Sequence, residues 1–147
     1  MPGAIFNEKM ETLSPEDEAA MERELLPRQM AYVAGASGFY RRKFRAAGID
    51  PASVQSRQEL ARLPFTTKSE LRDSQARRPP FGDFCAAPDE TIRRVHRTSG
   101  TTGRFVYTAL TAADLALTHD CGARAFWAAG LRPHNRVVHC LNYCLWM

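Results

Sequence analysis

The sequence lacks the features that would place it among membrane, disordered or repeat proteins. No apolar run approaches the roughly 20 residues that a membrane-spanning helix needs, so we expect no membrane partner. There is no low-complexity segment and no internal repeat. The chain has 147 residues, 44% of them hydrophobic, which suits one ordinary folded domain.

The cysteines also lack the spacing of common metal and redox motifs. The chain has four cysteines, none in a CxxC pair: Cys85, Cys121, Cys140 and Cys144. Residues 2–10 lack the apolar segment of a signal peptide, so we expect a cytoplasmic protein with reduced thiols. His139 and Cys140 would point to opposite faces of a strand, which disfavours a metal site with Cys144. We expect buried, apolar thiols instead.

Charge is unevenly distributed along the chain. The net charge is +4, yet residues 1–24 hold seven acids against Lys9 and Arg23, so the remainder is basic and should attract anions. No aromatic-basic module for nucleic acid is present, and we expect no nucleic-acid partner. A nucleoside triphosphate or CoA is an equally suitable anion. A basic nucleic-acid binder stays as an alternative, and its binding would weaken steeply with salt.

The first half of the sequence predicts helices. Ser14 and Pro15 form a helix start, and Pro27 should kink or divide the helix that follows. One face of this helix is apolar: Ala19, Leu26, Met30 and Val33. Residues 35–38 predict a turn, and residues 39–44 a short helix that ends at Gly48.

Two reciprocal capping boxes predict further short helices. They are Ser56-x-x-Glu59 and Thr67-x-x-Glu70. The inward side chains should be Leu60, Leu63 and Leu71. We therefore expect a helical region over residues 1–75 and an ordered, proline-rich connection over residues 76–91.

The second half predicts an α/β fold. Residues 92–98 should form a strand, 99–104 a loop, and 105–107 a second strand. Thr111 should cap a long helix that Gly130 ends, and residues 136–141 should form a third strand. Residues 92–147 then form the start of an α/β domain behind the helical region.

The loop between the first two strands has a composition suited to phosphate. Its residues are Thr98, Ser99, Gly100, Thr101, Thr102, Gly103 and Arg104. Glycines let amide hydrogens approach an anion, hydroxyls donate to phosphate oxygens, and Arg104 adds a guanidinium. The glycine spacing is not that of a Walker loop. A plain Ser/Thr/Gly turn without a ligand remains the alternative.

Residues 96–104 resemble the phosphate-binding motif of adenylate-forming enzymes. Upstream, residues 39–44, 47–49 and 63–68 look like the N-terminal region of phenylacetate-CoA ligases. Downstream, residues 107–114 and 129–133 continue the likeness. Several matches in one order, from about Leu13 to the last residue, indicate a resemblance to the phenylacetate-CoA ligase family.

The resemblance implies a two-step reaction. A carboxylate, expected to be aromatic, attacks ATP to give an acyl-adenylate and pyrophosphate, and CoA then displaces AMP. The loop residues 98–104 would hold the β- and γ-phosphates, with Mg²⁺ as a further cofactor. Arg104 stands where the family commonly has Lys, and Phe105 where it commonly has Pro. Tyr143 and Trp146 would line the acyl pocket, and the alternative, which their residue types favour at a strand end, is that both fill a core.

The resemblance covers only the beginning of such a ligase. The adenine-binding segment, the acid that holds Mg²⁺ and the C-terminal domain with its lysine have no counterpart in the 147 residues. We therefore expect no thioester formation by this chain alone, and a homodimer or a complementary C-terminal chain as partner. The alternative function is a non-enzymatic helical interaction module in which the loop is a structural turn.

Overall fold

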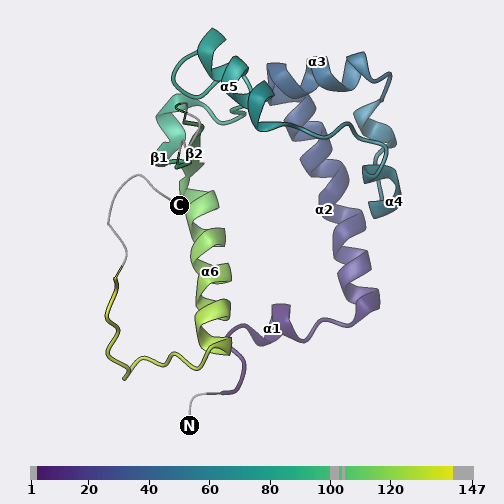
Figure 1. Cartoon of the computed structure of the whole chain (residues 1–147). Coiled ribbons are helices and arrows are strands. Elements are labelled where there is room, and N and C mark those ends of the chain that lie inside the picture. The colour runs from purple at the N-terminus through teal and green to yellow at the C-terminus, as the bar shows by residue number, and fades with distance from the viewer. Residues whose placement is uncertain (1–2, 100–102, 104, 141–147) are drawn as a thin grey trace.

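The computed structural model describes residues 3–99, 103 and 105–140, which form a helix-rich fold with one small β-hairpin. In chain order, the helices and strands are α1 (Glu8–Glu11), α2 (Pro15–Ala36), α3 (Gly38–Ala46), η1 (Pro51–Ser53), α4 (Arg57–Leu60), α5 (Lys68–Arg77), η2 (Asp89–Thr91), β1 (Ile92–Arg97), β2 (Tyr107–Thr111) and α6 (Ala112–Ala128). Figure 1 shows α2 and α6 as two long helices on opposite sides of the molecule. At one end they are connected by α3, α5 and the hairpin, and at the other by α1 and the chain before it.

Helix α2 begins as the sequence predicts and continues further than expected. The Ser14 hydroxyl accepts a hydrogen bond from Asp17 N at 3.1 Å, which caps the first turn. Pro27 does not divide the helix, which continues to Ala36. The predicted turn over residues 35–38 is therefore wrong in extent: Ser37 alone separates α2 from α3 and caps α3. A proline interrupts one backbone bond, and packing of the helix face can offset that loss.

The main hydrophobic core lies where α2, α3 and the segment after it meet. Met30, Phe44 and Val54 are buried there. The partly buried residues packed against them are Leu26, Val33, Ala34, Tyr40, Ile49 and Leu63. Leu60, predicted to point inward, is 37% exposed. Its helix α4 is only four residues long, so this side chain stays at the surface.

The two predicted capping boxes form to different degrees. At α5, Thr67 and Glu70 bond reciprocally, as expected. At α4, the Ser56 hydroxyl caps the helix, and the Glu59 carboxylate accepts from the Ser56 hydroxyl at 3.0 Å and from Gln55 N at 2.7 Å. The Glu59 side chain therefore also bonds one residue before the predicted box.

β1 and β2 form an antiparallel hairpin that leads directly into α6. The register pairs Arg97 with Tyr107 and continues to Ile92 opposite Thr111, with an irregularity between Ile92 and Arg94. The second strand was predicted at residues 105–107 and lies at 107–111. Thr111 and Asp114 then form a capping box, and Gly130, with φ of 91°, follows the end of α6 as predicted.

The predicted third strand is absent from residues 136–140. These residues have no regular secondary structure, and Val137 and Val138 are 64% and 86% exposed. A strand forms only when neighbouring backbone completes its hydrogen bonds. Within the described ranges no segment pairs with residues 136–140, so the apolar run remains extended and exposed.

The cysteine prediction is also partly wrong. Cys121 and Cys140 are exposed and Cys85 is half-buried, so none of the three is the buried thiol that was expected. Cys144 lies outside the described residues. In the part of the chain that is placed, His, Cys, Asp and Glu side chains form no group of three or more that could hold a metal ion. No helix placed there has the length and apolarity to cross a membrane.

Candidate functional site

The phosphate-type loop connects the two strands of the hairpin. Beyond the last strand pair, Thr98 N donates to Val106 O at 3.0 Å, and Val106 N donates to the Thr98 hydroxyl at 3.1 Å. These two bonds close the loop at its base. The Thr98 oxygen predicted to face phosphate therefore already accepts a backbone hydrogen bond.

Three of the seven predicted loop residues can be placed. Thr98 is half-buried at the base, whereas Ser99 is exposed on the first side of the loop. Gly103 is exposed and has φ of 81°, a conformation that glycine adopts without strain. The other predicted site residues lie outside the described ranges: Gly100, Thr101, Thr102, Arg104, Tyr143 and Trp146.

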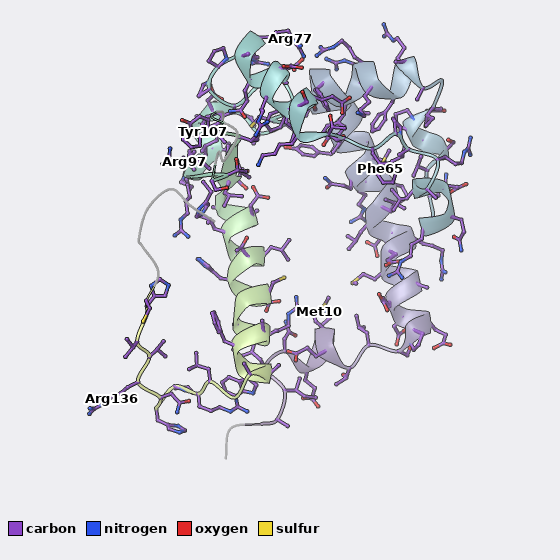
Figure 2. All side chains as sticks on the ribbon, viewed as in Figure 1. Met10, Phe65, Arg77, Arg97, Tyr107 and Arg136 are labelled. Atoms are coloured by element: carbon purple, nitrogen blue, oxygen red, sulfur yellow. The ribbon has the colours of Figure 1, made fainter. Side chains whose placement is uncertain are left out.

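Phe105 and Val106, which lead from the loop into β2, are also held in place. The guanidinium of Arg97 lies 4.1 Å from the centroid of the Phe105 ring, and Val106 is buried. Arg97 and Tyr107 lie together at this end of the hairpin in Figure 2. A cation over an aromatic face is attractive, so this contact stiffens Phe105, the position where the resembling family commonly has Pro.

Gln75 connects the hairpin to α5, and sequence reasoning missed it. Its side-chain oxygen accepts from Tyr107 N at 3.1 Å, and its side-chain nitrogen donates to Pro80 O at 2.7 Å. The residue is 8% exposed, and the oxygen and the nitrogen of its amide are each hydrogen-bonded. Gln75 therefore positions the start of β2, directly after the loop, against α5 and the connection behind it.

Asp83 is a second positioning residue that the sequence did not reveal. Its backbone oxygen accepts from Phe39 N at 3.1 Å and from the Ser37 hydroxyl at 2.9 Å. Its carboxylate accepts from the Ser74 hydroxyl at 2.6 Å and pairs with Arg42. Burial acts to raise the pKa of Asp83, but the bonds from Ser74 and Arg42 outweigh burial, so the pKa lies below its ordinary value. Asp83 thus joins α3 and α5 as a carboxylate.

Curated relatives of the chain have one name in common. No protein-family model matches the chain. Its sequence is 39% identical over 141 residues to a phenylacetate-coenzyme A ligase of Thermus thermophilus, covering 96% of this chain and 31% of that protein. It is 33% identical over 144 residues to the enzyme of the same name from Escherichia coli, again covering 96% of this chain, and 32% of that protein. The chain belongs to the phenylacetate-CoA ligase family.

Solved structures agree with this family assignment. A 2-hydroxyisobutyryl-CoA ligase in complex with 2-HIB-AMP and CoA superposes with a TM-score of 0.81 at 35% identity. The match covers 89% of this chain and 28% of that one. The same ligase in the postadenylation state gives a TM-score of 0.81 at 32% identity, covering 90% of this chain and 27% of that one. The fold is that of the N-terminal part of an adenylate-forming ligase.

The matched length is small relative to the family. The chain spans about 31% of the length of the curated ligases that it matches.

Proposed function

We propose that this chain is the N-terminal part of an AMP-forming acyl- or aryl-CoA ligase and that its hairpin loop binds the β- and γ-phosphates of ATP. The observation that carries the proposal is the hairpin itself, with Ser99 and Gly103 exposed on a loop closed by Thr98 and Val106. The loop is fastened to the rest of the fold at its base, so amides and hydroxyls on it can be prearranged for an anion.

In the proposed reaction, a carboxylate oxygen attacks the α-phosphorus of ATP and pyrophosphate leaves. The CoA thiol then attacks the acyl carbon and AMP leaves. In the first step, negative charge develops on the departing pyrophosphate, and donors from the loop would stabilise it. We assign Ser99, Thr101, Thr102 and the amides of Gly100 and Gly103 to this role, with the Arg104 guanidinium beside them.

Mg²⁺ would supply further charge neutralisation on the phosphates. Acidic oxygen ligands are what this ion requires from a protein. The described residues contain no group of acids suited to hold a metal, so we assign none of them to Mg²⁺.

We further propose an aromatic carboxylic acid as substrate. The relatives are named for phenylacetate, and Tyr143 and Trp146 supply aromatic surface for such an acid. We also propose that the chain forms no thioester alone and that the rest of the ligase, as a continuous or a complementary chain, is needed.

The test is carboxylate-dependent exchange of pyrophosphate into ATP. It compares this chain alone with this chain joined to the remaining part of the Thermus thermophilus ligase. Exchange is expected only in the joined protein, with phenylacetate among the acids tried. Lack of exchange in a well-folded joined protein, with the intact Thermus ligase active in parallel, would refute the assignment.

Variants of the joined protein test the loop. Ser99→Ala and Arg104→Gln should each lower kcat/KM for ATP roughly tenfold or more, since each removes a donor to a charged phosphate. Arg45→Gln is the matched control, because Arg45 is an exposed arginine of α3. Equal activity of the loop variants and the control would leave the loop as a structural turn.

A further inference from the structure

A polar cavity of about 650 Å³ lies between the start of α3 and the end of α5. Four arginines line it, together with Gly38 and Asp83: Arg41 and Arg42 on α3, and Arg77 and Arg78 at the end of α5. Figure 2 places Arg77 on α5, at the end of the molecule where α3 and the hairpin also lie. Thr98, Ser99 and Gly103, the hairpin-loop residues that the structure describes, do not line this cavity.

Two of the arginines are already held in place by the protein. Arg42 pairs with the Asp83 carboxylate, which Ser74 fixes from the other side. Arg41 donates to Gly35 O at 3.0 Å. Side chains that are ordered before binding lose less conformational entropy when a ligand arrives.

The other two arginines have no such partner. Within the described residues, the guanidinium groups of Arg77 and Arg78 form no ion pair and no hydrogen bond. The backbone of Arg78 is nevertheless fixed, since its N–H donates to Ser74 O at 3.0 Å and its carbonyl accepts from Gly82 N at 2.7 Å. Four guanidinium groups against one carboxylate leave a net charge of +3 around the cavity.

Gly38 keeps this space open. A side-chain carbon at that position would lie 3.2 Å from an Asp83 carboxylate oxygen, 3.4 Å from an Arg42 nitrogen and 3.9 Å from an Arg41 nitrogen. Because Gly38 has no side chain, the guanidinium groups of Arg41 and Arg42 stay uncovered.

We propose that this cavity binds a diphosphate group, either free or as part of a nucleotide. Guanidinium forks match the spacing of phosphate oxygens, and several of them are needed to neutralise a diphosphate. The proposal depends on the arginines of the cavity alone and does not rest on the function proposed for the hairpin loop.

The test is calorimetric titration of the 147-residue chain with inorganic diphosphate and, separately, with ADP. Arg77→Gln/Arg78→Gln should weaken diphosphate binding roughly tenfold or more, because each substitution removes a charged hydrogen-bond donor. Neither side chain has an ion-pair or hydrogen-bond partner among the described residues, so the thermal unfolding midpoint should stay unchanged. Tighter binding of ADP than of diphosphate, with the same sensitivity to the variant, would assign the site to a nucleotide, and equal binding would assign it to the phosphates alone.

A double variant with the same charge loss separates this site from general attraction by a basic protein. Arg45→Gln/Arg136→Gln removes two exposed arginines that do not line the cavity, and it should leave binding unchanged. Equal losses in the two double variants, or no loss in Arg77→Gln/Arg78→Gln, would overturn the proposal.

Diphosphate binding at the hairpin loop would give a different pattern. Arg104→Gln should not change diphosphate binding to the cavity. If binding in this chain is lost with Arg104→Gln and kept with Arg77→Gln/Arg78→Gln, the cavity proposal is wrong and the hairpin loop is the anion site.

Discussion

At the scale of single residues, Gly82 has no room for an added side-chain carbon. Its φ is 75°, and an added side-chain carbon would lie 2.7 Å from the Ser74 hydroxyl and 2.9 Å from the Phe84 ring. The same hydroxyl holds the Asp83 carboxylate. Gly82→Ala should therefore lower the free energy of unfolding by about 1–3 kcal/mol, through backbone strain and displacement of Ser74. Urea denaturation measures this loss.

Gly35→Ala is the matched control for this prediction. Gly35 lies within α2 and has open space where the new carbon would be placed. The substitution should raise the free energy of unfolding by about 0.5–1 kcal/mol, because alanine is the better helix former. An equal effect of the two substitutions would show that the close contact at Gly82 has no energetic consequence.

Gln75 gives a second prediction at this scale. Gln75→Leu leaves Tyr107 N and Pro80 O without their partner. Each unsatisfied buried group costs about 1–3 kcal/mol, so the unfolding free energy should fall. The joined ligase should also bind ATP more weakly, because the start of β2 is no longer positioned. Gln58→Leu, at an exposed glutamine, should change neither the unfolding free energy nor the ATP affinity. If Gln75→Leu left the ATP affinity unchanged, Gln75 would not position the loop for ATP.

At the scale of elements, Glu70 joins the cap of α5 to α3. Its carboxylate pairs with Lys43 at 2.5 Å and accepts from Thr67 N at 2.7 Å. The hydrogen bond from Lys43, followed by those from Thr67, lowers the pKa of Glu70 from 4.5 to about 2. The stabilisation is thus complete above pH 4.5 and is lost as the pH falls from 4.5 towards about 2.

This dependence can be measured as the free energy of unfolding against pH across that window. Glu70→Gln should flatten part of the acid-side decline, because the neutral amide does not titrate. Glu90→Gln, at an exposed acid in η2, should leave the profile as it is in the unsubstituted chain. A profile for Glu70→Gln that matches the unsubstituted chain would contradict the assignment of this pair.

Helix starts were the features best predicted from the sequence. Ser14, Thr67 and Thr111 cap α2, α5 and α6 as expected, because a cap depends on bonds within three residues. The prediction of a third strand was wrong because an apolar pattern indicates only which residues avoid water. Whether a strand forms there depends on a neighbour, and the described residues supply none for 136–140.

At the scale of the whole molecule, much apolar surface is uncovered. Leu117 and Phe126 on α6 are 64% and 63% exposed, and Val137 and Val138 after α6 are also exposed. Apolar surface of this kind marks an interaction site. The chain spans about 31% of its relatives' length. In the joined ligase, we therefore expect the added Thermus sequence to cover α6.

The 147-residue chain should therefore bind a hydrophobic dye such as anilinonaphthalene sulfonate, and the joined ligase should bind much less. Leu117→Ser/Phe126→Ser should reduce dye binding by this chain while leaving its unfolding midpoint almost unchanged, because neither side chain is buried. Phe65 lies between α4 and α5, and its ring is 93% exposed. Phe65→Ser tests whether the loss of any exposed ring reduces dye binding equally. Equal dye binding by the joined protein would contradict coverage of α6.

The sequence by itself determined the helix starts, the presence of the hairpin loop and the ligase family, because these depend on residues adjacent in the chain. Only the tertiary structure revealed Gln75, Asp83 and the four-arginine cavity. Tyr107 bonds to a side chain 32 positions away, and Asp83 to one 46 positions away. No local pattern encodes such contacts, because they arise when packing of α3, α5 and the hairpin brings distant polar groups together out of water.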